Sequence, residues 1–262
     1  MSYVEDLFGI AGKVALVTGG SRGIGLMIAE GMVQAGARVY ISSRKAEVCD
    51  REAARLSKAG TCVSLPADLG SLAGCTALAE ALQAKERKLD VLVNNAGANW
   101  GAPMAEYPDE AWDKVFELNV KSIFNLTRAL LPQLEAAASA AAPARVLNVG
   151  SIDGIRAPIL DTYAYSSSKA AVHHLTRVLA HKLAPKHITV NAIAPGPFDS
   201  KMMHETLETF RDAIVSSNPL KRIGEPSDMA GVAIYLASKA GAYMTGAIIP
   251  VDGGMSTWRG DW

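Results

Sequence analysis

Short apolar runs alternate along this chain with longer stretches of helical character. Within the runs apolar and polar residues do not alternate, which is typical of strands buried on both faces of a parallel sheet. The predicted strands are Val14–Val17, Arg38–Ile41, Thr61–Leu65, Val91–Val93, Arg145–Val149, Ile188–Ile193 and Ala247–Val251. The predicted helices are Ile24–Gln34, Ala46–Lys58, Leu72–Lys85, Asp109–Glu135, Tyr163–Leu183 and Ser227–Ser238. This order predicts an α/β fold with a doubly wound, seven-stranded parallel sheet covered by helices on both faces.

The organisation along the chain predicts one domain over residues 1–262, because that length suits one large α/β unit and no linker interrupts it. One segment, residues 196–219, breaks the strand–helix rhythm and contains a short helical stretch. It follows a strand at the sheet edge where open α/β sheets bind ligands, so we interpret it as a substrate lid. The alternative is a surface helix packed on the body.

Charge and composition exclude several classes of protein. Lys plus Arg and Asp plus Glu number 26 each, which gives no basic footprint for nucleic acid or an acidic membrane. The cysteines Cys49, Cys62 and Cys75 form no paired motif, which suits reduced thiols in the cytoplasm. The histidine pair at 173–174 points in two directions on a helix, so we expect no metal site. We also expect no membrane span and no secretory signal.

Glycines occupy positions 19, 23 and 25, directly between the first predicted strand and the first helix. A chain that turns sharply beside a pyrophosphate excludes side chains at such positions. The helix that starts near Ile24 directs its free N–H groups and the positive end of its dipole at the phosphates. The segment therefore predicts a dinucleotide site.

The second predicted strand is followed by Ser42, Ser43 and Arg44, with no carboxylate. NAD sites usually place an acid there to bind the ribose 2′-hydroxyl. Arg44 and Ser43 suit a 2′-phosphate instead, and Arg22 in the glycine turn can approach from the other side. The sequence therefore favours NADP(H) over NAD(H). The alternative for Arg44 is a solvated residue at the start of a helix.

Tyr165 and Lys169 lie one helical turn apart on the same face. A nearby ammonium group favours the phenolate form of tyrosine, so we expect Lys169 to lower the pKa of Tyr165 and to make it an acid–base catalyst. Such pairs are also common on exposed helices. Ser151, which follows a buried strand at the ligand-binding edge, makes the catalytic interpretation stronger because its hydroxyl can bind a substrate oxygen beside Tyr165.

Two groups of amides fit the same site. Asn94 and Asn95 precede Ala96 and Gly97 at the end of the fourth predicted strand. Asn119 interrupts the apolar pattern of the long helix that follows, where an amide competes with the backbone and needs a reason. The alternative for Asn119 is a buried amide whose hydrogen bonds are satisfied locally.

These motifs together resemble the short-chain dehydrogenases/reductases over nearly the whole chain, from Lys13 to Gly254. The resemblance rests on Thr18-Gly19-x-x-x-Gly23-x-Gly25, Asp68, Asn94-Asn95-Ala96-Gly97, Asn119, Ser151, Tyr165-x-x-x-Lys169 and Pro195-Gly196. It implies a single-domain Rossmann fold, an NADP(H)-dependent oxidoreductase, and assembly as a homotetramer or homodimer. The small residues of the fifth predicted helix, Ala170, Ala171 and Ala180, would permit close packing between subunits or against the chain's own sheet.

The resemblance also implies the role of each site residue. Tyr165 is the acid–base catalyst, Lys169 binds the nicotinamide ribose, Ser151 positions the carbonyl and Asn119 holds a relay water. Ser200 stands where the family usually has Thr and keeps a hydroxyl for the carboxamide. The cofactor-binding residues are Gly19, Ser21, Arg22, Gly23, Ile24, Gly25, Ser43, Arg44, Asp68, Leu69, Asn95, Ala96, Gly97, Tyr165, Lys169, Pro195, Gly196 and Ser200.

Within the family the chain looks most similar to the β-ketoacyl reductases, including the rhamnolipid-associated type. The expected substrate is a 3-oxoacyl thioester on coenzyme A or acyl carrier protein, contacted by Ser151, Trp100, Met202 and Met203. Basic residues near the lid, namely Lys201, Arg211, Lys221 and Arg222, would face a carrier or be ordinary solvated charges. A sugar, polyol, cyclic ketone or quinone dehydrogenase remains an alternative. A catalytically silent NADP(H)-binding sensor or scaffold is a further one.

Overall fold

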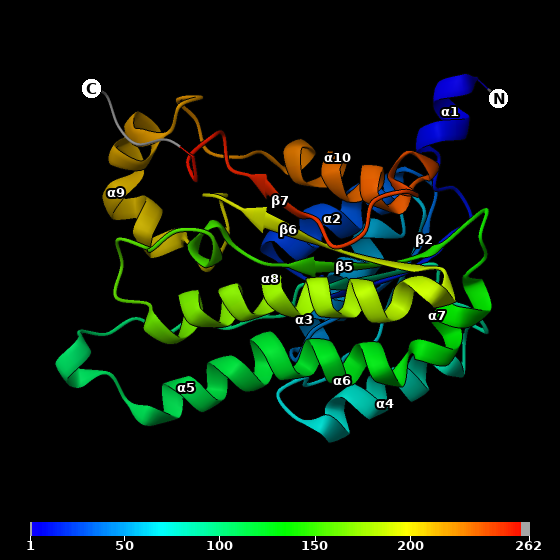
Figure 1. The fold of residues 1–262 in the computed structure, drawn as a ribbon, viewed down its shortest axis with the longest axis horizontal. Helices are drawn as coiled ribbons and strands as arrows, with labels where there is room; N and C mark the ends of the chain where they lie inside the picture. The colour runs from blue at the N-terminus through cyan, green and yellow to red at the C-terminus, as the bar shows by residue number, and fades with distance from the viewer. Residues whose placement is uncertain (1, 258–262) are drawn as a thin grey trace.

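The structure is a computed structural model that describes residues 2–257. Its centre is a seven-stranded sheet in the order β3-β2-β1-β4-β5-β6-β7, and every neighbouring pair is parallel (Figure 1). The strands are β1 Val14–Thr18, β2 Arg38–Ser42, β3 Thr61–Ser64, β4 Val91–Asn94, β5 Ala144–Val149, β6 Ile188–Pro195 and β7 Ile248–Val251. The predicted α/β class and strand number are confirmed. The direction of strand addition reverses between β1 and β4, and ligands bind outside such a switch point.

Helices cover both faces of the sheet. One face carries α2 Gly23–Gln34, α3 Ala46–Leu56 and α10 Pro226–Ala237. The other carries α4 Leu72–Gln83, α5 Asp109–Phe116, α6 Ser122–Ala129, α7 Leu131–Ala137 and α8 Tyr163–Leu183. Along β1, Ala15 and Val17 enter the first core while Val14 and Leu16 enter the second. This explains why the strand reads as an unbroken apolar run.

The predicted unbroken helix over Asp109–Glu135 is wrong in detail. A π-helical turn, η2 Glu117–Lys121, separates α5 from α6, and Leu130 ends α6 before α7. The π turn accommodates Asn119, whose amide bonds a neighbouring loop instead of facing along the helix. Pro132 lies in the first turn of α7, where a missing N–H costs nothing.

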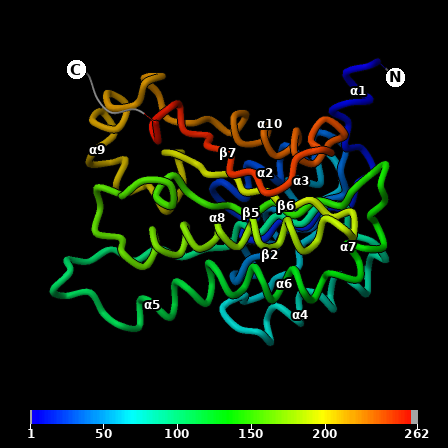
Figure 2. The backbone as a smooth tube through the Cα atoms, viewed as in Figure 1, coloured from blue at the N-terminus to red at the C-terminus, as the bar shows by residue number. Residues whose placement is uncertain are grey.

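The carboxyl ends of the strands point toward one end of the molecule. There the tube in Figure 2 shows α9 His204–Ser217, the loop before α8 and the loop after β4. Phe210 has non-helical dihedral angles and kinks α9. The shorter 3-10 elements are η1 Met104–Glu106, η3 Ile152–Gly154, η4 Ala184–Lys186 and η5 Lys239–Gly241. Residues 196–219, which the sequence predicts to be a lid, therefore include a helix at this end of the sheet.

At the other end, a short helix that the sequence reading missed, α1 Tyr3–Phe8, precedes the sheet. Ser2 and Glu5 form a capping box at its start, and this sequence pattern could have predicted the helix.

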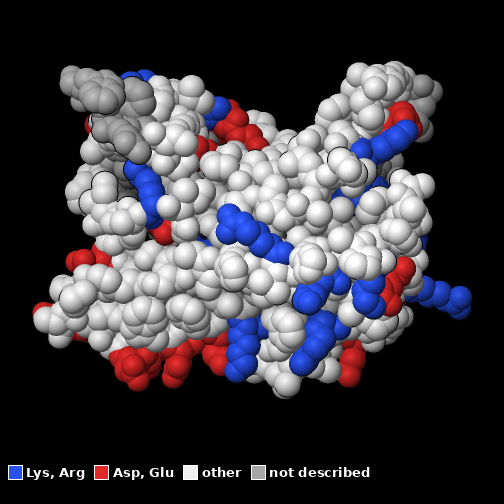
Figure 3. Space-filling model, in the orientation of Figure 1, with Lys and Arg blue, Asp and Glu red and all other residues white. Residues whose placement is uncertain are grey.

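In Figure 3 acidic side chains gather along the lower edge, where α5 lies in Figure 1. Asp109 and Glu110 occupy the first turn of α5, where they complement the helix dipole. Among the described residues, no helix is long and apolar enough to cross a bilayer.

Candidate active site

The glycine turn has the geometry that its residues require. Gly19 and Gly23 adopt positive φ angles of 64° and 52°, which L side chains rarely adopt. A Cβ on Gly25 would lie 2.3 Å from Nδ2 of Asn95. The turn leads into α2, whose cap residue Arg22 offers no side-chain hydrogen bond to the helix. The first N–H groups of α2 are therefore directed at the space beyond the turn.

Asn95 and Thr18 hold the turn against the end of β4. Asn95 donates from Nδ2 to the carbonyl oxygen of Thr18 at 2.9 Å, and the Thr18 hydroxyl accepts the amides of Asn95 and Ala96 at 2.9 and 3.0 Å. These bonds join β1 and β4 at the switch point. The predicted grouping of Gly19, Asn95 and Ala96 is therefore present in the structure.

The residues predicted for the adenosine end also converge. Arg44 and Asp68 line one cavity of about 230 Å³, together with Lys114 of α5. Asp68 accepts the backbone N–H of Gly70 at 3.1 Å, and Leu69 beside it is buried. Ser21 is buried within the glycine turn, Ser43 is half-buried, and Ile24 lies in the first turn of α2. Within residues 2–257, Arg22 and Arg44 are exposed and make no ion pair.

Asn119 ties the π turn to the loop that follows β4. Its Oδ1 accepts the amide of Ala98 at 2.8 Å, while its Nδ2 donates to the carbonyl oxygen of Ala98 at 2.9 Å and to Oγ of Ser168 at 3.0 Å. Ser168 in turn donates to the backbone carbonyl of Tyr165 at 2.6 Å. A Cβ on Gly97 would lie 3.2 Å from Oδ1 of Asn119. The amide thus connects the cofactor loop with the helix that carries Tyr165.

Ser151, Tyr165 and Lys169 meet beyond the end of β5. Ser151 follows Val149 and Gly150 and accepts the N–H of Asp153 at 3.1 Å as it caps η3. Lys169 reaches from α8 to donate to the carbonyl oxygen of Val149 at 2.8 Å, and its Nζ lies 5.5 Å from the centre of the Tyr165 ring. The sequence therefore identified three residues from two chain segments that fold into one cluster.

The protonation of this cluster differs from the expectation. Burial and the negative charge of Asp153 raise the pKa of Tyr165 to about 12, and a hydrogen bond with Ser151 opposes the rise. Burial lowers the pKa of Lys169 to about 8 against the opposing effect of Asp153. The predicted lowering of the Tyr165 pKa is not found in the protein alone, where burial and the charge of Asp153 raise it. A phenol of ordinary pKa is already protonated at neutral pH, and the raised pKa extends that range to more alkaline pH.

The end of β6 borders the cofactor side of the site. Pro195 is the last residue of β6, and a Cβ on Gly196 would lie 2.7 Å from Cβ of Asp252, so the two segments pack directly. Ser200 lies opposite the glycine turn, since a Cβ on Gly23 would be 3.1 Å from Cβ of Ser200. The start of the lid thus contacts the expected pyrophosphate turn.

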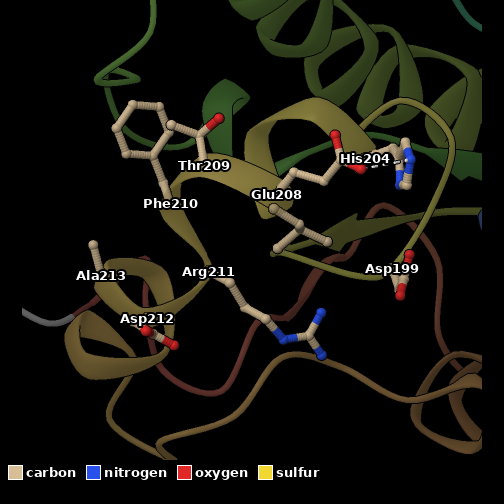
Figure 4. Close-up of a pocket in the computed structure, with 9 residues that line it drawn as sticks. Asp199, His204, Glu208, Thr209, Phe210, Arg211, Asp212 and Ala213 are labelled. Atoms are coloured by element: carbon tan, nitrogen blue, oxygen red, sulfur yellow. Dashed lines mark ion pairs between the residues drawn. The ribbon is translucent and has the colours of Figure 1, made fainter.

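The lid lines its own cavity, drawn in Figure 4, with a volume of about 700 Å³. In this view Arg211 extends into the open space while Phe210 points away from it, and His204 pairs with Glu208. Met202 and Met203 precede α9, and Met202 is 47% exposed. The lid residues therefore present apolar surface to solvent.

Trp100 lies on the loop after β4 and turns toward α5. Lys114 places its ammonium group 4.9 Å from the centre of the Trp100 ring, a cation–π contact. Lys114 also lines the cavity of Arg44 and Asp68. The ring of Trp100 therefore contacts Lys114 of α5, and its contact with the substrate stays a prediction.

Sequence reasoning missed three residues near the site. Asp153 is the acid whose charge acts on both Tyr165 and Lys169. His173 continues the Tyr165–Lys169 face of α8 by one more turn and is buried. Tyr107 bonds the start of α8 from the loop after β4. The i+4 spacing was a usable signal for His173, while the other two contacts come from loop geometry.

Comparison with known proteins adds a family match. A family model described as enoyl-(acyl carrier protein) reductase matches residues 19–256. A rhamnolipids biosynthesis 3-oxoacyl-[acyl-carrier-protein] reductase from Pseudomonas aeruginosa is 53% identical over 253 residues, which cover 96% of this chain and 99% of the relative. A galactitol 2-dehydrogenase (L-tagatose-forming) from Cereibacter sphaeroides is 36% identical. The aligned residues cover 98% of this chain and 100% of that relative.

A solved structure agrees with these relatives. The RhlG/NADP active-site complex of Pseudomonas aeruginosa superposes with a TM-score of 0.94 at 52% identity. The match covers 96% of this chain and 99% of that one. The likeness therefore extends over the whole sheet, its helices and the lid.

Proposed function

The chain belongs to the short-chain dehydrogenase/reductase family, and from that premise we propose that it is an NADP(H)-dependent reductase of 3-oxoacyl thioesters. The family resemblance read from the sequence is confirmed. The observation that carries the proposal is the cluster of Ser151, Tyr165 and Lys169 beyond the end of β5, where a half-buried phenol lies beside a hydroxyl and a buried ammonium group. A protonated phenol is the form that reduction of a carbonyl requires.

The cofactor site of this chain fits NADP(H). The uncapped start of α2 and the positive φ angles of Gly19 and Gly23 suit a pyrophosphate. Arg44 lines a cavity with Asp68 and is free of ion pairs within the described residues, so it suits a 2′-phosphate, with Arg22 and Ser43 beside it. When bound, the reduced nicotinamide supplies the hydride.

The protein residues handle the proton and the orientation of the substrate. The hydroxyls of Ser151 and Tyr165 bind the carbonyl oxygen, and Tyr165 donates its proton to the oxygen as the alcohol forms. Lys169, charged below its pKa of about 8, stabilises the resulting phenolate and holds the ribose. Asn119 connects this helix with the cofactor loop and, in this proposal, borders the relay water that returns a proton to Tyr165.

The thioester class rests on the relatives and on the lid. The relatives include 3-oxoacyl-[acyl-carrier-protein] reductases at 53% and 36% identity, both from Pseudomonas aeruginosa. Met202 is 47% exposed on the proposed lid, where an acyl chain would cover it. Residues 196–219 therefore act in this proposal as a substrate lid on a single domain.

Two of the four basic residues that the sequence offers for contact with a carrier already bind other groups of the protein. Arg222 pairs with Asp228 through both guanidinium nitrogens, and Lys221 donates to the carbonyl oxygen of Ser216. Lys201 and Arg211 are exposed and remain as candidates for the phosphopantetheine arm of acyl carrier protein or coenzyme A. Their exchange for alanine in turn identifies the carrier contact.

Assembly and location remain proposals. The exposed Trp112, Phe124 and Val178 lie on α5, α6 and α8, and such a face suits a homotetramer or homodimer. Light scattering on the purified protein gives the subunit number. The reduced state of the three buried cysteines suits a cytoplasmic enzyme.

Oxidation of NADPH tests the proposal directly. Acetoacetyl-coenzyme A and longer 3-oxoacyl thioesters are compared with ketoses and cyclic ketones, and NADH is the paired control. We expect turnover to rise with acyl length and to require Tyr165, so that Tyr165→Phe loses it while NADPH binding persists. A second candidate, a polyol dehydrogenase, is favoured by the galactitol 2-dehydrogenase relative. Activity confined to sugars would replace the thioester with that class.

A further inference from the structure

The helix that carries Tyr165 begins without help from its own cap residue. Among the described residues, Thr162 makes no side-chain hydrogen bond to the first turn of α8. Instead the N–H of Ala164 donates to the hydroxyl of Tyr107 at 3.2 Å, across 57 residues of sequence. Ala164 has no exposed surface, so water does not replace this acceptor without rearrangement. Tyr107 therefore supplies a long-range cap to α8.

The same hydroxyl is bound on its other side. It donates to the carbonyl oxygen of Trp100 at 3.3 Å, and Trp100 lies on the loop that begins with Asn95, Ala96 and Gly97. A second bond joins the same two segments, from the N–H of Ala102 to the carbonyl oxygen of Asp161 at 3.2 Å. One phenol thus connects the cofactor loop with the first turn of the catalytic helix.

The ring of Tyr107 packs against aromatic side chains on two sides. It packs edge-on against Tyr163 with centres 5.2 Å apart at 83°, and against Trp112 of α5 at 6.2 Å and 63°. Edge-to-face pairs of this kind fix ring orientation. The hydroxyl is therefore directed at Ala164 by packing on two sides.

We infer that Tyr107 is a positioning residue for Tyr165, which it places against Ser151 through the first turn of α8 and the loop after β4. The inference rests on the proposed function, in which Tyr165 donates the proton. Ala164 immediately precedes Tyr165, so a shift of that peptide moves the phenol. Errors of about 1 Å in a reacting group can cost on the order of 100-fold in rate.

Tyr107→Phe removes the bridging oxygen and keeps the ring. We expect kcat for 3-oxoacyl reduction to fall about ten-fold while KM for NADPH changes less than two-fold. The solvent deuterium isotope effect on kcat should rise, because proton donation from a displaced Tyr165 limits the rate. A role confined to folding would lower the melting temperature and leave both the isotope effect and the kcat of the folded enzyme unchanged.

Tyr163→Phe is the matched control. Tyr163 lies in the same turn, and its hydroxyl donates to Asp161 at 2.8 Å at the surface. This variant should keep kcat within two-fold of the native value. Amide hydrogen exchange in the peptide containing residues 162–166 supplies a reading independent of turnover: it should accelerate in Tyr107→Phe and remain slow in Tyr163→Phe.

The outcomes separate this inference from the function on which it rests. If Tyr165→Phe loses turnover and Tyr107→Phe keeps native kcat and isotope effect, Tyr107 has no positioning role and the proposed function stands. If Tyr165→Phe keeps turnover, the proposed function fails. Equal losses of kcat in Tyr107→Phe and Tyr163→Phe would also overturn the inference, because loss of any hydroxyl near the start of α8, and not of the bridge in particular, would then be responsible.

Discussion

Lys169 donates a hydrogen bond of 2.8 Å to the carbonyl oxygen of Val149, the last residue of β5. The bond joins the catalytic helix to the central sheet directly before Ser151. Lys169 is only 5% exposed, so its ammonium group is largely removed from water. Burial lowers the pKa of this group to about 8, so the charge that serves catalysis costs stability.

Replacing Lys169 by Met should therefore stabilise the protein and abolish turnover. Unfolding takes up a proton between the folded pKa of about 8 and the unfolded value of 10.5, so native stability rises with pH in that window. We expect the free energy of unfolding of the variant to exceed that of the native protein by about 1–2 kcal/mol at pH 7 and by less at pH 10. Urea unfolding at both pH values measures the gain. A pH-independent difference would contradict the buried charge as its source.

The reductive pH profile should be set by Lys169 and not by Tyr165. Tyr165, with a pKa of about 12, stays protonated across the assay range, whereas Lys169 loses its charge near pH 8. We expect kcat/KM for acetoacetyl-coenzyme A to be flat from about pH 6 to 7.5 and to decline as pH rises through 8. A decline that begins near pH 6 would argue against this assignment.

A substitution of Asp153 tests whether Lys169 sets the pH profile of kcat/KM. Its charge raises the pKa of Lys169, so Asp153→Asn should move the alkaline decline to lower pH. Asp161→Asn, an exposed acid on the same loop, is the matched control and should leave the profile in place. A common shift in both variants would indicate a general charge effect.

Arg44 should decide between the two nicotinamide cofactors. Arg44→Ala removes a guanidinium that lines the cavity with Asp68, so KM for NADPH should rise about 10- to 100-fold, as expected for a charged hydrogen bond. KM for NADH should change little. Lys45→Ala, the exposed neighbour, controls for net charge. If both variants weaken NADPH equally, long-range attraction and not contact explains the preference.

His173 should contribute to acid sensitivity. Burial lowers its pKa to about 4, and the ring packs on Gly150, whose added Cβ would lie 2.2 Å from Nε2. Between the unfolded value of 6.5 and the folded value, unfolding takes up a proton, so stability falls as pH drops through this window. Between pH 6.5 and pH 4, the free energy of unfolding of His173→Leu should fall by about 1–3 kcal/mol less than that of the native protein. Exposed His174→Leu is the control, and melting curves give the comparison.

The strands were predictable from the unbroken apolar runs that recur between the helical stretches. Burial on both faces of the sheet makes each strand apolar throughout, as in Val14–Val17. The site residues were predictable where their position is fixed by a strand end or by helical spacing, as for Ser151, Tyr165 and Lys169. Asn119 was recognised as out of place in a helix, and the π turn explains it.

The remaining features depend on contacts that sequence spacing does not encode. Tyr107 caps a helix 57 residues away, and Arg145, 2% exposed within β5, donates to the carbonyl oxygens of Leu236 and Ser238 at the end of α10. The burial of Tyr165 and the nearby charge of Asp153, which together raise the pKa of Tyr165, are likewise not encoded in the i+4 spacing. Each depends on where a loop or helix end lies after folding.

The lid helix α9 buries only Leu207. Its other side chains contribute little to the core, so exchanges along it should be neutral for folding while they reshape the cavity in Figure 4. Natural drift can therefore sample new substrates in this helix without first acquiring compensating mutations in the sheet. A library confined to the exposed residues 208–213 would keep most of its members folded, and we expect this segment to tolerate changes in specificity best.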